Sequence, residues 1–216
     1  MKLELLSASV VVIAKDHNPT ILHPAFLTSQ GIVPDDWQVA DAPLCTPAFS
    51  LAQYKNGITF NVESNRFVVT EERPAGNPKD SKIAELAISY TKKLPYVHYK
   101  ATGANFNGFC LCQEPEQFLI ERFLQKGPWN DETQSMRAFG SRFLYDIEGT
   151  ILRFGLDGGE VNREGKSQPA ILVNGNFHAE LPSENPLAAL EELLNRWSDH
   201  RDQFTSLSKV ILGMEA

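Results

Sequence analysis

The last quarter of the chain limits the choice of fold most strongly, because its apolar residues recur three and four positions apart almost to the C-terminus. The run starts after Asn185-Pro186, and its seam consists of Leu187, Leu190, Leu194, Trp197, Phe204 and Ile211. Such spacing is typical of an amphipathic helix with one apolar face. Arg201 and Ser208 interrupt the seam. The pattern predicts a long C-terminal helix that packs against the rest of the chain or against a partner.

The preceding part of the chain favours β-strands. Residues 3–15 are rich in β-branched side chains, and three further strand patterns follow at 49–54, 58–63 and 66–72. Lys55-Asn56-Gly57 separates the first two of these three, and Asn-Gly favours a type I′ hairpin turn. We expect a three-stranded antiparallel meander.

A helical pattern follows each group of strands. The first is predicted at 82–94, where Pro95 ends it, and a shorter helix is predicted between Pro115 and Gly127. The second group of strands is predicted at 136–147, 151–156 and 170–181, with turns at Glu148-Gly149 and Asp157-Gly158-Gly159.

The order of strands and then a helix, met twice, predicts an α+β fold with a mostly antiparallel sheet in two strand-rich halves. A βββα-like pseudo-repeat would explain this order, although no residue-level identity between the halves supports it. We expect a single globular unit over residues 1–216, with halves 1–112 and 113–216 packed together.

Charge and composition argue against several classes of partner. The formal net charge of −7 disfavours nucleic acid, because nucleic-acid-binding proteins use Lys and Arg to neutralise phosphates. No apolar stretch is long enough to cross a bilayer, and residues 5–14 lack the basic start of a signal peptide. Three cysteines do not suit the disulfide framework of a secreted protein. We therefore expect a soluble cytoplasmic protein that binds neither nucleic acid nor membrane.

Recognised catalytic and cofactor motifs do not occur in the sequence. It contains no phosphate-binding loop and no Gly-x-Ser-x-Gly nucleophile motif. We accordingly expect no cofactor, and the balance favours a protein that is not an enzyme. Catalytic residues can nevertheless come from distant parts of a chain.

Residues 16–47 form an irregular segment with five prolines, too long to be a simple connection. Asp16, His17 and His23 lie in it and suit a metal site or a general base, whereas its aromatic residues Phe26 and Trp37 suit a contact with a partner. The two histidines are six positions apart with a proline between them, which fits neither a helical zinc pair nor a zinc finger. The simpler alternative is exposed turn residues and a helix cap.

Two further candidates lie on an extended segment. Cys110 and Cys112 would place both thiols on one face of a strand, where they could begin a metal site if two more ligands joined them. The alternative is that they pack as small hydrophobic residues. His98 lies between Tyr96 and Tyr99, and this segment either lines a cleft or forms a half-exposed strand.

Two hypotheses for function follow. The leading one is a non-enzymatic interaction or adaptor protein that contacts a protein partner, or a second copy of itself, through segment 16–47, the C-terminal helix or both. Its contact residues would be Phe26, Trp37, Leu194, Trp197 and Phe204. The alternative is a small-molecule-binding protein or hydrolase-like enzyme with a site near Asp16, His17 and His23, facing His98. A site requires these side chains to converge in one cleft.

Overall fold

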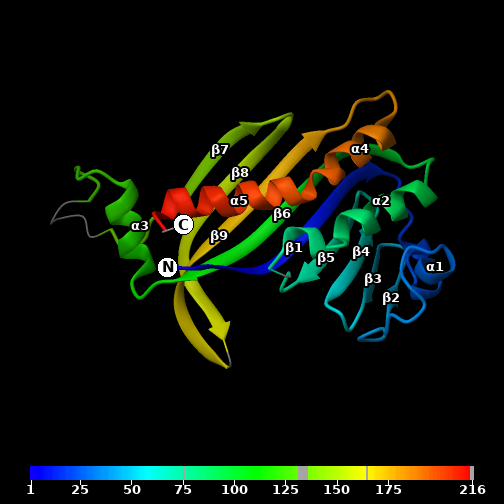
Figure 1. Cartoon of the computed structure of the whole chain (residues 1–216), viewed down its shortest axis with the longest axis horizontal. Coiled ribbons are helices and arrows are strands. Elements are labelled where there is room, and N and C mark those ends of the chain that lie inside the picture. Colours follow the sequence, from blue (N-terminus) through cyan, green and yellow to red (C-terminus); the bar gives the residue numbers. More distant parts are fainter. Residues whose placement is uncertain (75, 131–135, 164, 215–216) are drawn as a thin grey trace.

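One antiparallel sheet joins all the strands of the part of the chain that the computed structural model describes, residues 1–74, 76–130, 136–163 and 165–214. Its strand order is β2-β3-β4-β5-β1-β6-β9-β8-β7 (Figure 1). The strands are β1 (Leu3–Lys15), β2 (Leu44–Cys45), β3 (Phe49–Gln53), β4 (Ile58–Glu63), β5 (Arg66–Glu72), β6 (His98–Leu111), β7 (Ser141–Ile147), β8 (Thr150–Arg163) and β9 (Lys166–Glu180). The predicted α+β class with a mostly antiparallel sheet is confirmed.

The helices lie on one face of this sheet and at its two ends. They are α1 (Pro24–Ser29), α2 (Ile83–Lys93), α3 (Pro115–Phe123), α4 (Pro186–Asn195) and α5 (Trp197–Leu212). Figure 1 shows α2, α4 and α5 crossing the sheet on the same side, with α1 and α3 at opposite ends of the molecule. None of the described helices is long and apolar enough to span a membrane.

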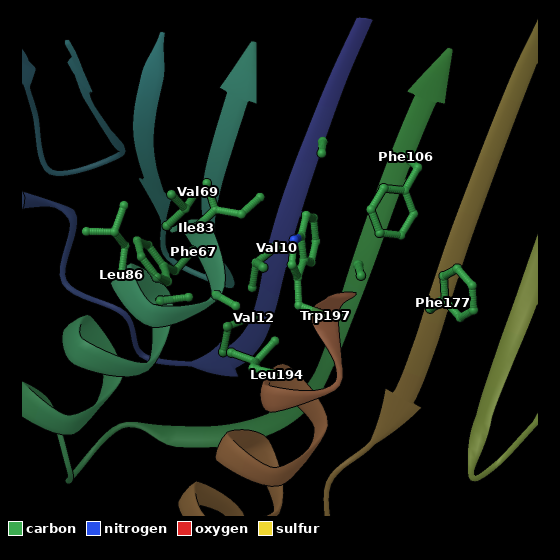
Figure 2. Close-up of a cluster of buried hydrophobic side chains, with 14 of the residues drawn as sticks. Val10, Val12, Phe67, Val69, Ile83, Leu86, Phe106, Phe177, Leu194 and Trp197 are labelled. Carbon is green, nitrogen blue, oxygen red and sulfur yellow. The ribbon is translucent and has the colours of Figure 1, made fainter. Parts of the chain in front are cut away.

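Side-chain alternation along the central strands builds the core beneath the three crossing helices. Val10 and Val12 of β1 and Phe106 of β6 are fully buried and point towards Leu194 and Trp197 (Figure 2). The residues between them on the strands are polar or only half buried and face the other way. One covered face and one solvated face is the usual arrangement of an antiparallel sheet.

Apart from β2 at one edge, the strand order is symmetric about the central β1–β6 pair. On one side β1 is followed by β5, β4 and β3, and on the other side β6 is followed by β9, β8 and β7. Each group of three ends in a helix that returns over the sheet, α2 in the first half and α4 in the second. The topology agrees with the predicted pseudo-repeat and adds one strand to the start of each unit. The division into halves 1–112 and 113–216, and the duplication itself, stay predictions.

The C-terminal amphipathic run forms two consecutive helices, not the single long helix predicted from its spacing. Arg196 ends α4 and precedes α5 with φ −89° and ψ 12°. Its guanidinium donates to the Glu148 carbonyl at 2.8 Å and pairs with the Glu148 carboxylate, so the break faces the β7–β8 turn. A break of one residue leaves the three-four spacing almost in phase, which is why the sequence did not reveal it.

The predicted turn at Asp157-Gly158-Gly159 is wrong, because β8 continues through these residues. Both glycines lie close to neighbouring side chains: a Cβ at Gly158 would lie 2.9 Å from Glu116 Cγ, and one at Gly159 would lie 2.9 Å from Leu172 Cδ1. The chain reverses later, where Gly165 takes a φ of +77°.

The hairpin at Lys55-Asn56-Gly57 is confirmed, but its turn type is not I′. Gly57 has a φ of +85°, whereas Asn56 is not in the left-handed region that type I′ also requires there. Tyr54 and Ile58 pair through a backbone hydrogen bond of 2.9 Å, which leaves a three-residue loop. Asn56 instead accepts a hydrogen bond from the Ile58 N–H at 3.1 Å.

Candidate functional site

The proline-rich segment is fixed to the body of the protein by apolar anchors. Leu22 and Leu27 are fully buried, and Ile32 and Val33 are nearly so. The backbone N–H groups of Ile32 and Val33 both donate to the Leu27 carbonyl, at 2.9 and 3.2 Å. Gly31, with a φ of +66°, permits this reversal after α1. The segment therefore has a defined shape although it contains little regular structure.

This shape leaves a groove of about 480 Å³ between residues 28–37 and the first turns of α2. We call it the α1–α2 groove. Its apolar lining consists of the exposed Pro34, the half-buried Trp37, and Ile32, Val33 and Leu86, which are each at most 6% exposed. Trp37 is half buried and rests edge-on against Tyr54, with ring centroids 5.3 Å apart. An indole held in this way is a pre-ordered contact surface, because it would lose little side-chain conformational entropy when a partner binds.

Acidic side chains predominate at the rim of the α1–α2 groove. Asp35 and Glu85 are exposed carboxylates that line it, against the single ammonium group of Lys82. Asp36, also exposed, follows Asp35 directly. The rim therefore favours a positively charged ligand, in agreement with the acidic charge of the whole chain.

Phe26, the other aromatic residue predicted to contact a partner, is half buried and packs edge-on against Tyr90 with ring centroids 6.4 Å apart. The predicted contact residues of the C-terminal helices have a different environment. Leu194, Trp197 and Phe204 are at most 4% exposed, so they belong to the core of the chain and offer no surface to a partner. The core interpretation of the apolar seam is confirmed.

Asp16, His17 and His23 do not form one site. Asp16 is highly exposed, and His23 caps α1 by accepting the Ala25 N–H on Nδ1 at 3.2 Å. His17 is buried, and neither of its ring nitrogens has a hydrogen bond of ordinary geometry within the described residues. Burial lowers the pKa of His17, against a smaller opposite effect of the Val12 backbone.

Asp16 does meet His98, as the alternative hypothesis expected. The Asp16 Oδ2 atom lies 3.9 Å from His98 Nδ1, because antiparallel pairing brings the end of β1 to the start of β6. Next to this pair is an open cleft of about 630 Å³, lined by residues 95–100 and 180–183. We call it the end cleft. Tyr96 in its wall is 94% exposed.

Cys110 behaves as a small hydrophobic residue. It is fully buried, its Sγ atom lies 3.7 Å from the Met214 sulfur, and burial raises the pKa of its thiol to about 11. Cys112 lies just after β6 and is half buried. Within the described residues, no three His, Cys, Asp or Glu side chains are grouped closely enough to hold a metal ion.

The solvated face of the sheet carries a row of paired polar side chains that the sequence did not reveal. Ser9, Asn105, Asn176 and Arg153 are successive neighbours across four strands. The Asn105 amide lies 3.3 Å from the Ser9 hydroxyl, Asn176 donates to Asn105, and Arg153 lies 3.4 Å from Asn176 Oδ1. Asn at alternate positions of two strand segments is the only sequence signal for it. Because these groups satisfy one another, the row works as a structural ladder.

A second residue missed by sequence reasoning is His200 of α5, which is only 4% exposed. Its ring stacks on Phe177 with centroids 4.5 Å apart, and its Nε2 atom has no partner within the described residues. Burial, helped by the nearby charge of Arg196, lowers the pKa of His200 to about 4, despite the opposing effects of Asp199 and Glu148. The imidazole is neutral at physiological pH.

Comparison of the chain with models of known protein families finds no match, and comparison with curated proteins finds none either. Function must be argued from the geometry of the chain itself.

Proposed function

We propose that the protein is a non-enzymatic interaction module, and that the α1–α2 groove holds a segment of another protein. The observation that carries this proposal is the groove itself: an irregular segment is anchored at four buried positions, yet Trp37 stays only half buried and lines the groove together with Leu86. Tryptophan in a partly enclosed apolar hollow is the residue most often found at the energetic centre of a protein–protein contact.

The charges at the rim of the groove define the kind of segment that would bind. Asp35 and Glu85 line the groove with only Lys82 to oppose them. A ligand that matches this surface has an apolar side chain to fill the space beside Trp37 and a Lys or Arg next to it. Apolar anchoring provides affinity, and the charge contact provides register and a faster encounter.

Selection from a random-sequence peptide library against the intact protein tests the proposal while the natural partner is still unidentified. We expect enriched peptides that combine an apolar residue with adjacent Lys or Arg. Trp37→Ala should weaken their binding by at least about tenfold, which corresponds to about 1.4 kcal/mol. Glu85→Lys, on an exposed helical position, should weaken binding through charge alone and leave the fold intact.

Trp129→Ala is the matched control, because Trp129 is 56% exposed and lies outside the groove. It should bind selected peptides as the wild type does. Enriched peptides that bind equally well to the wild type, Trp37→Ala and Glu85→Lys would refute the groove as the contact surface. Failure of any peptide to enrich would count against the interaction function itself.

A second candidate function, small-molecule binding in the end cleft, is favoured by the contact between Asp16 and His98. An imidazole beside a carboxylate can hold or move a proton at the wall of an open cleft. Native mass spectrometry of protein purified without added ligand tests it. A co-purifying small mass that is lost in both Asp16→Asn and His98→Ala would support this candidate, and a mass retained in both variants would contradict it.

A further inference from the structure

The two edges of the sheet are protected to very different degrees. At one edge β2 is only two residues long, and Pro43 and Pro47 flank it, which are usual devices against pairing with another strand. At the other edge β7 has seven residues and no proline. Figure 1 shows β7 as the outermost strand. Within the described residues, β8 is the only segment to which the β7 backbone is hydrogen bonded.

The solvated face of this open edge carries an exposed apolar residue between two opposite charges. Leu144 is 65% exposed, and Ile151 on the neighbouring strand is 42% exposed. Arg142 and Asp146 flank Leu144, and neither makes an ion pair with any of the described residues. They cannot reach each other, because four residues along a strand span about 13 Å.

We propose that two copies of this chain pair through their β7 strands in antiparallel fashion, with Leu144 opposite Leu144 of the second copy. Arg142 of each copy then lies opposite Asp146 of the other, so each of these side chains gains an opposite charge in the dimer. The strand is self-complementary about its central residue, as a two-fold interface requires. The two sheets would continue as one through the shared edge.

The choice of register follows from the alternation of side chains. Residues directly opposite each other in an antiparallel pair point to the same face. The helices of both copies lie on the same side of the joined sheet only if each residue of β7 pairs with a residue whose side chain points to the same face of its own sheet. A register shifted by one residue breaks this condition and is excluded. A shift of two residues would place Leu144 opposite a charged residue, either Arg142 or Asp146. Only the register with Leu144 opposite Leu144, which we call the symmetric register, pairs Arg142 with Asp146 at both places. It also buries the Leu144 side chains of the two copies against each other.

The other face of β7 agrees with the same register. Phe143 and Tyr145 are half buried on the side that the helices cover, with ring centroids 6.4 Å apart. In the symmetric register Phe143 lies opposite Tyr145 of the second copy, an aromatic cross-strand pair. The pairing thus extends the core on one face and matches charges on the other. The pairing involves no residue of the α1–α2 groove, so the result of a dimerisation test is independent of the proposed function.

Charge exchange at two positions, followed by sedimentation analysis over about a hundredfold range of protein concentration, tests the proposal. The wild type should dimerise. Arg142→Asp alone and Asp146→Arg alone each place like charges opposite each other twice per dimer and should weaken dimerisation at least about tenfold. The double variant restores opposite charges and should recover the dimer. A mixture of the two single variants should form a heterodimer.

Lys2→Asp is the matched control for Arg142→Asp, because it lowers the net charge by the same amount at an exposed position outside the strands. It should dimerise as the wild type does. A wild type that stays monomeric over the whole range, or a dimer that is insensitive to both single exchanges, would overturn the proposal. So would a double variant as weak as the singles while its circular dichroism and melting temperature match those of the wild type.

Thiol cross-linking tests the register itself. In a Cys45→Ser background, which removes the exposed native thiol, Leu144→Cys should give a covalent dimer under mild oxidation or with a short bis-thiol reagent, because opposed Cβ atoms lie about 5 Å apart. Val210→Cys is the control, since Val210 of α5 is 74% exposed but far along the chain from β7. Equal cross-linking of the two variants, or none in Leu144→Cys, would contradict the symmetric register.

Discussion

His200 should make the stability of the fold depend on pH in a defined direction. Its ring is buried between α5 and Phe177, and its pKa is lowered from 6.5 to about 4. Above pH 6.5 the imidazole is neutral in both the folded and the unfolded state, so it adds no pH dependence there. As the pH falls below 6.5, the unfolded chain takes up a proton that the folded chain does not. The free energy of unfolding therefore decreases, and this loss ends near pH 4.

The size of the loss follows from the difference between the two pKa values. From 6.5 to about 4, at 1.36 kcal/mol per pKa unit, the full loss is about 3 kcal/mol. Between about pH 7.5 and about pH 5, some 2 kcal/mol of it should be lost. Burial of His17, whose pKa is also lowered, adds a loss in the same direction.

Urea unfolding of the wild type and His200→Phe at these two pH values measures the effect. The variant keeps an aromatic ring on Phe177 but cannot bind a proton, so about 2 kcal/mol of the pH dependence should disappear. Trp129→Phe is the control, because Trp129 is 56% exposed and carries no titratable group, and it should retain the pH dependence of the wild type. An unchanged pH dependence in His200→Phe would refute the burial of a neutral His200.

Three other outcomes follow from burial and close packing. Cys45, which is exposed, should react quickly with a thiol reagent, whereas Cys110, with its pKa raised to about 11, should react only on unfolding. Gly175→Ala would bring a Cβ within 2.5 Å of the buried Phe204 ring and should lower the free energy of unfolding by about 1–3 kcal/mol, whereas Gly76→Ala, which has open space around it, should not. Trp197→Ala should cost about 3–5 kcal/mol in chemical denaturation, since the indole is almost fully buried.

Local patterns predicted most of the secondary structure because each is decided by neighbours in the sequence. The meander at 49–72 follows from period-two alternation and turn residues, and α2 at Ile83–Lys93 follows from a three-four stripe that ends before Pro95. The predicted secondary structure was wrong where the role of a residue depends on a contact with a part of the chain that is distant in sequence. Gly158 and Gly159 are typical turn residues, yet they make room for side chains from α3 and β9.

The candidate sites were harder to predict because they depend on which strands become neighbours. Asp16 and His98 meet only because β1 and β6 pair, and Arg196 breaks a helix where it meets Glu148. His200 lies between charged residues in the sequence, so nothing local indicated that its ring is buried. The α1–α2 groove likewise requires segment 28–37 to fold against a helix that begins far along the chain.

NMR mapping of a selected peptide on the wild-type protein tests the central claim most directly. If the α1–α2 groove is the contact surface, the largest shifts should fall on the Trp37 indole, the backbone amides of Ile32 and Val33, and the Leu86 methyl groups. The shifts should saturate with a single affinity. Shifts centred on Tyr96 and His98 at the end cleft, with the Trp37 indole unmoved, would contradict the claim and assign the binding function to the end cleft.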